Sequence, residues 1–306
     1  MKTNDLLIRN PAMRDVVTIE QMRELERKAN ANGIAYSVMM ENAGRAIAQV
    51  VQSLLESMPN SPGNVLVLVG SGSNGGDGLE AGRFLKQSNL AKVTCYVAHS
   101  RSATDLLLQN TLASGVSVTL AAQDPEGNTL KFLVRDADVI VDALIGIGAR
   151  LPIRENMRQL LFTVSDMRLR PPADISIPLC SPAYPDKSSY NHKFIVAVDC
   201  PSGLDCNTGE IDPAALYADS TVTFAAAKFG HFIFPGAIAT GKLIIADIGI
   251  PGLDNPQFQV ETAESIYTRL PSRSSDAHKG TYGRTVIVAG SDSYRGAPLL
   301  CGMASY

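Results

Sequence analysis

The sequence lacks the features that mark secreted, membrane-bound or nucleic-acid-binding proteins. It has no tryptophan, and no apolar run approaches the roughly 20 residues that a membrane span needs. Residues 1–15 are too charged and too broken for a secretory signal. The formal net charge is -3, without a block rich in lysine or arginine. Neither nucleic acid nor a membrane is therefore an expected partner.

Cysteine is also scarce. The five cysteines contain no C-x-x-C pair and are odd in number: Cys95, Cys180, Cys200, Cys206 and Cys301. This argues against a structural zinc site and against a disulfide framework, and it favours a reducing cytoplasm as the location. The composition is otherwise that of a globular chain, with 45% hydrophobic and 19% charged residues. With 306 residues it can bury one large core or two smaller ones.

Glycine, in contrast, is concentrated in one stretch. An apolar run at 65–69 leads into Gly70-Ser71-Gly72-Ser73-Asn74-Gly75-Gly76-Asp77-Gly78, and residues 79–87 are then typical of a helix. A strand, a glycine loop and a helix in that order form an anion site, and G-x-G-x-x-G is matched from Gly70. That match alone is weak, because such a loop is often only a tight turn. Asn74 and Asp77 are more specific, since a phosphate cradle needs neither; we expect these side chains to coordinate something.

The rest of the chain alternates between strand and helix patterns. Strands are expected at 92–98, 116–120, 138–142, 195–199, 220–225 and 242–247, and helices from a Thr18 cap and at 35–58, 103–114 and 128–136. This order predicts an α/β fold: a Rossmann-like three-layer αβα sandwich with a mostly parallel sheet. Residues 170–191, rich in proline and serine, are expected to form an inserted exposed loop.

After residue 251 the pattern weakens. Residues 255–275 resemble a connector with one short helix near 263–268, and 285–290 and 291–306 are predicted as a strand and a helix. One strand and part of a helix cannot bury a core. This tail either completes the first sheet or opens a second domain.

Three of the predicted strands end in polar residues followed by glycine. Asn74, Asp142 and Ser202 follow or end these strands, whose carboxyl ends share one edge of a parallel sheet. Their oxygen atoms are hard ligands, suited to potassium or magnesium and not to zinc. A single strand-end aspartate is usually a turn or cap residue, but three matching ends favour a site.

Asp199 is the strongest candidate for acid/base chemistry. It follows a very apolar strand, where a partly buried carboxyl can be tuned towards neutral pH, although it could also cap the next turn. Lys228 is the single cation in a long apolar segment; it could meet a phosphate or Asp199, or extend to the surface. The four histidines have neither triad nor metal spacing, and His231 and His278 are interpreted as structural.

Five motifs resemble, in order and spacing, the YjeF N-terminal family, whose members are NAD(P)H-hydrate epimerases. They are Met40-Glu41-Asn42-Ala43-Gly44, Asn74-Gly75-Gly76-Asp77-Gly78, Val141-Asp142-Ala143-Leu144, Val198-Asp199-Cys200-Pro201-Ser202-Gly203-Leu204-Asp205 and Asp247-Ile248-Gly249-Ile250-Pro251. The resemblance covers about 17–251. It implies an isomerase that interconverts the R and S forms of hydrated NADH or NADPH (NADHX, NADPHX) at C6 of the nicotinamide ring.

The resemblance also implies a homodimer and a set of site residues. Potassium would be held by Asn74, Asp142 and Ser202. The substrate would contact Ser73, Asn74, Gly75, Gly76, Asp77, Gly146, Ile147, Gly148, Ala149, Arg150, Leu151, Pro152 and Asp199. We hypothesise that Asp199 protonates the departing C6 hydroxyl and later deprotonates the incoming water.

The tail resembles the entry to a ribokinase-like NAD(P)H-hydrate dehydratase domain, through His278-Lys279-Gly280-Thr281-Tyr282-Gly283-Arg284 and Gly290-Ser291. The expected division is an epimerase domain at 1–254, a linker at 255–277 and a truncated start of the second domain at 278–306. That domain's ADP site and catalytic aspartate would lie beyond residue 306, so dehydratase (lyase) activity is expected only in a longer bifunctional protein.

Three departures from the family pattern stand out. Ser73 replaces an asparagine, Ile147 replaces a common threonine, and the 170–191 insertion is longer than usual. None removes a predicted metal ligand or Asp199.

Two other functions compete with the epimerase. The first is a catalytically silent nucleotide-binding or scaffold module on the same fold. The second, an ordinary dehydrogenase, is weaker, because no acidic residue ends the strand at 92–98 to hold an adenine ribose.

Overall fold

A computed structural model describes residues 15–58, 63–102, 104–167, 193–261, 263–278 and 280–305. Its centre is a seven-stranded parallel sheet in the order β4-β3-β2-β5-β6-β7-β9. These strands are β2 (Gly63–Val69), β3 (Ala91–Val97), β4 (Ser117–Leu120), β5 (Val139–Ala143), β6 (Phe194–Val198), β7 (Ser220–Phe224) and β9 (Lys242–Ala246). A separate parallel pair joins β1 (Val16–Val17) to β8 (Ala227–Lys228).

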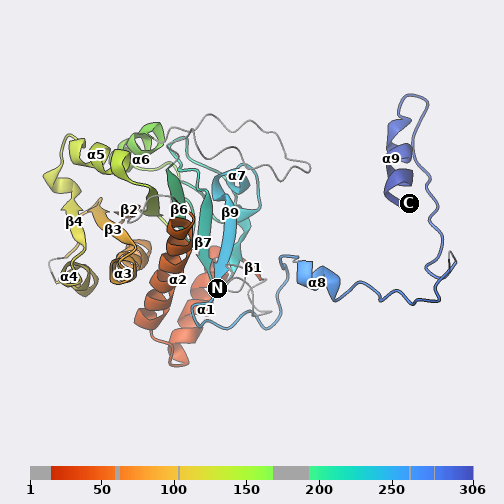
Figure 1. The fold of residues 1–306 in the computed structure, drawn as a ribbon, viewed down its shortest axis with the longest axis horizontal. Helices are drawn as coiled ribbons and strands as arrows, with labels where there is room; N and C mark the ends of the chain where they lie inside the picture. The colour runs from red at the N-terminus through yellow and green to blue at the C-terminus, as the bar shows by residue number, and fades with distance from the viewer. Residues whose placement is uncertain are drawn as a thin grey trace. The chain divides into compact units, whose positions relative to one another are not determined.

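Helices cover both faces of the sheet (Figure 1). They are α1 (Ile19–Ala31), α2 (Tyr36–Glu56), α3 (Ser73–Gln87), α4 (Leu106–Ala113), α5 (Asn128–Asp136), α6 (Glu155–Met167) and α7 (Gly236–Thr240), with short 3₁₀ turns η2 (Ala121–Gln123) and η3 (Phe229–His231). Alternate residues of β2 divide the core. Val65, Val67 and Val69 pack with α1 to α4, whereas Leu66 and Leu68 pack with α5 and α6. The predicted αβα sandwich is confirmed.

The strand order reverses direction between β2 and β5. From β2 the chain proceeds outwards through β3 and β4, and from β5 it proceeds the other way. In an open parallel sheet the crevice at such a switch point, outside the carboxyl ends of the strands, is where ligands bind. Asp142 lies near the carboxyl end of β5, and Asn74 lies in the segment that follows β2.

Helix α3 begins at Ser73, six residues earlier than the predicted start at Leu79. The glycines that made this segment resemble a loop are positions where the helix packs closely against neighbouring segments. A Cβ added to Gly75 would lie 2.0 Å from the Gly70 carbonyl oxygen, and one added to Gly78 would lie 2.5 Å from the Ala143 Cβ. Close packing on β2 and β5 therefore outweighs the poor helix propensity of glycine. Asn74 and Asp77 stand on the first turns of a helix.

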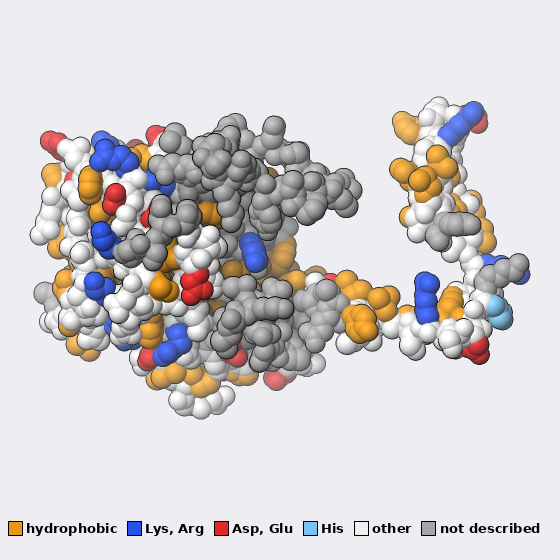
Figure 2. Space-filling view, viewed as in Figure 1, with side chains coloured by type: hydrophobic (Ala, Val, Ile, Leu, Met, Phe, Trp, Pro, Cys, Tyr) orange, Lys and Arg blue, Asp and Glu red, His pale blue; other side chains and the backbone are white. Residues whose placement is uncertain are grey.

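The described chain forms two compact units, Met1–Val260 and Glu261–Tyr306. The second contains α8 (Ala263–Tyr267) and α9 (Gly296–Ser305). The strand predicted at 285–290 is absent there, because an extended segment needs a partner strand and none of the described residues pairs with it. Figure 2 shows apolar side chains exposed along this unit; Val288 is 94% exposed.

The insertion predicted at 170–191 lies outside the described residues. Among the described residues, no helix combines the length and the apolar character required to cross a lipid bilayer.

Candidate functional site

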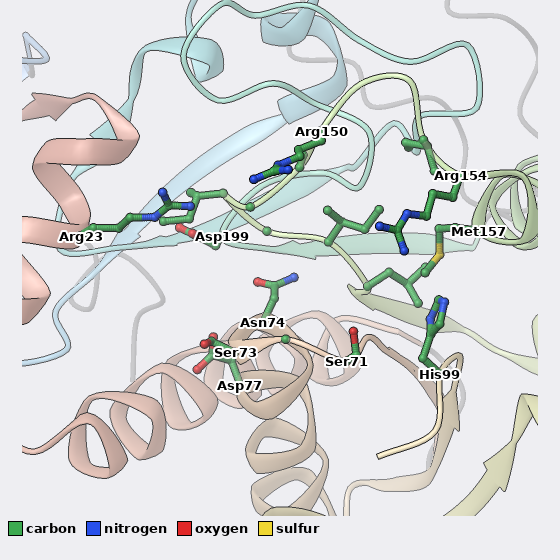
Figure 3. Close-up of a pocket in the computed structure, with 18 of the residues that line it drawn as sticks. Arg23, Ser71, Ser73, Asn74, Asp77, His99, Arg150, Arg154, Met157 and Asp199 are labelled. Carbon is green, nitrogen blue, oxygen red and sulfur yellow. The ribbon is translucent and has the colours of Figure 1, made fainter. Parts of the chain in front are cut away.

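A cavity of about 650 Å³ opens at the switch point of the sheet. Most of its lining comes from the start of α3 with the turn before it, the loop after β5 with the start of α6, the residue after β6, and one side of α1; His99 after β3 and Phe224 at the end of β7 complete it. In Figure 3 Ser71, Ser73, Asn74 and Asp77 lie on one wall, and Asp199, Arg23, Arg150 and Arg154 lie on the other.

Asp142 and Ser202 form a buried hydrogen-bonded pair next to the cavity, although neither is among its lining residues. The Ser202 hydroxyl donates to Asp142 Oδ1 over 2.6 Å, and the Ser202 amide donates to Oδ2 over 2.8 Å. The Leu144 amide adds a weaker bond of 3.3 Å to Oδ1. Both side chains are fully buried, and burial raises the pKa of Asp142, although the bonds from Ser202 and Leu144 oppose this. These hydrogen bonds join the end of β5 to the turn after β6.

Asp199 is held in an unusual conformation. Its φ is +61°, which is strained for a residue other than glycine. Its Oδ1 accepts from Lys228 Nζ at 2.5 Å and from the Thr223 hydroxyl at 2.9 Å. Lys228 is fully buried and also donates to Thr223 Oγ1 over 2.7 Å. Of the sequence alternatives for Lys228, the structure selects the pairing with Asp199.

The His231 ring contacts the backbone of both members of this pair, Lys228 and Asp199. Its Nδ1 accepts from the Lys228 amide at 3.2 Å, so the ring's proton lies on Nε2, which is 3.1 Å from the Asp199 carbonyl oxygen. Burial, together with the nearby Lys228 ammonium, lowers the pKa of His231 to about 3. The ring is therefore neutral, and the expected structural role is consistent with these contacts.

The cysteine expectation was wrong for one pair, since Cys200 and Cys206 are joined by a disulfide. The turn after β6 contains Gly203 at φ +105° and folds back, which brings these two residues together although the sequence between them contains no recognisable pairing motif. Both sulfurs lie close to the His231 ring, within 4.8 Å. With the sulfurs bonded to each other and the ring nitrogens engaged by backbone groups, this group offers no free ligand atom.

The amide of Asn74 points into the cavity. Its Nδ2 atom is buried and has no hydrogen-bond partner among the described residues. A buried amide without a partner is costly, which marks this atom as a position for a ligand. Gly146 packs against the same side chain; a Cβ there would come within 2.8 Å of Asn74 Oδ1.

Two further carboxyls line the cavity, Asp77 from α3 and Glu26 from α1. Burial and the neighbouring charge of Asp199 raise the pKa of Asp77 well above its ordinary 3.8. The same two causes raise the pKa of Glu26. Glu26 also has Arg23 one turn earlier on its helix as a compensating cation.

Most of the predicted substrate residues meet at this cavity. Those that line it are Ser73, Asn74, Asp77, Gly146, Ile147, Gly148, Ala149, Arg150 and Asp199. Gly75, Gly76, Leu151 and Pro152 are not among its lining residues, and Gly75 and Gly76 serve helix packing against Gly70 and Met40.

Sequence reasoning missed several lining residues, namely Arg23, Glu26, Ser71, His99, Arg154, Asn156 and Met157. His99 could have been found by the strand-end rule, because it follows β3 at the same edge of the sheet as the loop that contains Asn74. Arg23 and Glu26 are one turn apart on α1, beside the buried Met22 and Leu25. No signal distinguished them from an ordinary solvated face.

Most of the chain is similar in sequence to known proteins. The family model described as "YjeF-related protein N-terminus" matches residues 36–230. Curated relatives described as "Bifunctional NAD(P)H-hydrate repair enzyme Nnr" are 31% identical in Thermofilum pendens (94% of this chain, 50% of the relative) and 33% identical in Pyrobaculum aerophilum (96% and 52%). The chain therefore spans about half the length of these relatives.

A solved structure supports the fold. The crystal structure of yeast ynu0 (YNL200c) superposes with a TM-score of 0.58 at 22% identity, over 81% of this chain and 99% of the yeast chain.

Proposed function

Because the chain belongs to the family of YjeF-related protein N-termini, we propose that its first unit is an NAD(P)H-hydrate epimerase, an isomerase acting in nicotinamide nucleotide repair. The observation that carries this proposal is the Asp199 carboxylate, fixed by Lys228 at the wall of a cavity large enough for a nicotinamide nucleotide. A carboxylate with a specific charge partner at the wall of a cavity is more typical of an acid/base site than of a scaffold.

The chemistry required is removal and return of water at C6 of the ring. The hydroxyl at C6 is adjacent to the ring nitrogen, whose lone pair stabilises the cation left when the C–O bond breaks. Asp199 is placed to exchange a proton with the departing hydroxyl and the incoming water, a contribution of about 10²–10⁴-fold in rate. Asn74 Nδ2 and the loop at 146–150 are placed to orient the substrate.

The donor set also fits a monovalent cation. Asp142 is completely buried, and its recorded hydrogen-bond donors in the described part of the chain are all uncharged, which leaves a buried carboxylate without a compensating positive charge. Asn74, Asp142 and Ser202 would hold potassium through oxygen atoms. Bound there, the ion would supply that charge and fix the loop after β5.

The remaining expectations are kept as parts of the proposal. These are a homodimer, a preference for free NADHX or NADPHX over macromolecular partners, and residues 278–306 as the start of a ribokinase-like dehydratase domain. The cytoplasmic location stays a prediction as well; the Cys200–Cys206 disulfide removes part of the cysteine argument for it.

The test is epimer exchange measured by NMR on purified (R)-NADHX, with potassium chloride or with tetramethylammonium chloride at equal ionic strength. We expect acceleration over the spontaneous rate that requires potassium, and loss of most turnover but not of binding in Asp199→Asn. Acceleration without potassium dependence would retain the epimerase and remove the cation site. A folded protein that binds NADHX without accelerating exchange would instead be the silent module.

A further inference from the structure

Epimerisation imposes a geometric demand that Asp199 alone does not meet. The R and S hydrates differ in which face of the nicotinamide ring carries the hydroxyl, so water must leave from one face and return to the other. A ring held between two walls has one face towards each wall. A proton donor or acceptor is therefore needed on both sides, unless the bound ring turns over within the cavity.

Asp77 lies on the wall opposite Asp199 (Figure 3). Asp199 follows β6, whereas Asp77 is on the second turn of α3, beyond Asn74. Unlike Asp199, Asp77 has no recorded hydrogen bond or ion pair with any described residue, so its carboxyl is free to meet a ligand.

The two carboxyls have different charged neighbours. The charged groups that act on Asp77 are Asp199 after β6, Glu26 from α1, Lys228 from β8 and Glu80 from its own helix, three of them acidic. Burial and Asp199 raise the pKa of Asp77, whereas Asp199 has the Lys228 ammonium against its Oδ1. Asp199 thus has a cationic partner in direct contact, whereas Asp77 faces mainly acidic neighbours, and two carboxyls in such different surroundings suit different roles.

We propose that Asp77 is a second catalytic residue of the site, acting on the face of the ring opposite to the face served by Asp199. This rests on the proposed epimerase function. Glu26, the third carboxyl of the cavity, is less suited because it comes from α1, one turn from Arg23, which lies on the same wall as Asp199 (Figure 3).

The step balances without any further reactant. The Asp77 carboxylic acid gives its proton to the C6 hydroxyl, the C–O bonding pair leaves with the oxygen as water, and the ring nitrogen lone pair forms the C6–N double bond. Water then adds to the other face, its oxygen supplying the new bonding pair, and its proton passes to the Asp199 carboxylate. After this step the proton is on Asp199, and the enzyme can act on the opposite epimer. Alternatively, proton exchange with solvent restores the starting state, with Asp77 protonated and Asp199 ionised.

The test is incorporation of ¹⁸O from labelled water into each pure epimer of NADHX, followed by epimer-resolving chromatography and mass spectrometry. The wild type should interconvert the epimers and label both. Asp77→Asn should bind NADHX but lose at least about 100-fold in epimerisation. It should still catalyse exchange in one epimer, the one whose hydroxyl faces Asp199. Asp199→Asn should retain exchange only in the other epimer.

Controls separate catalysis from folding. Glu126→Gln removes an exposed carboxyl that does not line the cavity, and this variant should behave as wild type. Thermal unfolding reports whether Asp77→Asn is folded, and Asp77→Glu, which restores a carboxyl, should recover part of the activity.

Three outcomes would overturn the proposal. These are epimerisation by Asp77→Asn within about threefold of wild type, loss of exchange in both epimers by a folded variant that binds, or the single-face pattern in Glu26→Gln instead. Failure of the wild type to accelerate either reaction would refute the epimerase function itself, which is a distinguishable result.

Discussion

The buried pair of Lys228 and Asp199 links the proposed catalytic role of Asp199 to stability at the scale of single residues. Lys228 is fully buried and Asp199 is 7% exposed, so neither charge has much access to water. Removing one partner of such a pair leaves an uncompensated charge, which typically costs about 3–5 kcal/mol.

We therefore expect Lys228→Met to lower the free energy of unfolding by about that amount, measured by urea denaturation at pH 7. The double variant Lys228→Met/Asp199→Leu should recover part of the loss, because no lone charge remains. Equal stability of the single variant and the wild type would show that the pair contributes nothing net. Thr223→Val, which removes only the neutral bridge to Asp199, should cost far less.

His231 makes the fold sensitive to acid. Its pKa is about 3 in the folded protein and 6.5 in an unfolded chain, so below pH 6.5 the unfolded state binds a proton that the folded state does not. The stabilisation is complete above pH 6.5 and is lost as pH falls towards 3, by about 1.4 kcal/mol per pH unit.

The prediction is that His231→Gln removes this slope. The difference in unfolding free energy between wild type and variant should be constant above pH 7 and shrink by about 1.4 kcal/mol between pH 6 and pH 5. Urea titrations at three pH values provide the measurement. Parallel curves for the two proteins would mean that His231 is protonated equally in both states.

At the scale of elements, the contact between α2 and α3 depends on a glycine. A Cβ on Gly44 would lie 2.4 Å from the Glu80 Cβ and 2.9 Å from the Ala81 nitrogen. Because the obstruction includes backbone atoms, the helices themselves would have to separate.

Gly44→Ala should therefore destabilise the protein by about 1–2 kcal/mol, the overpacking cost less the gain in helix propensity. Thermal unfolding is the measurement. Gly148→Ala is the control, since a Cβ at that glycine meets no atom within 4 Å. Similar melting temperatures for the two variants would contradict the packing argument.

Elements were more predictable from sequence than contacts. The alternation of strand and helix patterns predicted the parallel sheet, and α5 was predicted with its observed bounds. The start of α3 was missed, because the glycines are required by close packing: Gly75 packs against Gly70, and Gly78 packs against Ala143, which is distant in sequence. The strand-end rule predicted that Asn74, Asp142 and Ser202 converge; in the structure Ser202 hydrogen-bonds to Asp142, and Asn74 lies on the first turn of α3. The rule could not decide whether Lys228 would reach Asp199 or the surface, because that depends on the turn between β7 and β8.

At the scale of the whole molecule, the two units differ in how they are stabilised. The described buried clusters draw their residues from the first unit. Apolar side chains of the second are exposed, among them Val288 and Leu300.

A chain ending at Val260 should therefore unfold within about 2 °C of the full chain and retain its epimerase rate. Differential scanning calorimetry and the NADHX assay test this together. A fall of more than about 5 °C, on the order of 1–2 kcal/mol, would mean that the second unit stabilises the first.

The short pairing of β1 with β8 has a consequence for synthesis of the protein. Val17 pairs with Lys228, the Val16 amide donates to the Phe258 carbonyl over 2.9 Å, and the Leu253 amide donates to Asp15 Oδ2 over 2.9 Å. A ribosome releases residues 16–17 more than 200 residues before these partners. The first strand of the nascent chain therefore stays unpaired until these partners have been synthesised. Helix α1 follows this strand directly and contributes Arg23 and Glu26 to the cavity wall, so a chain interrupted before residue 227 lacks the strand that holds the segment leading into this wall.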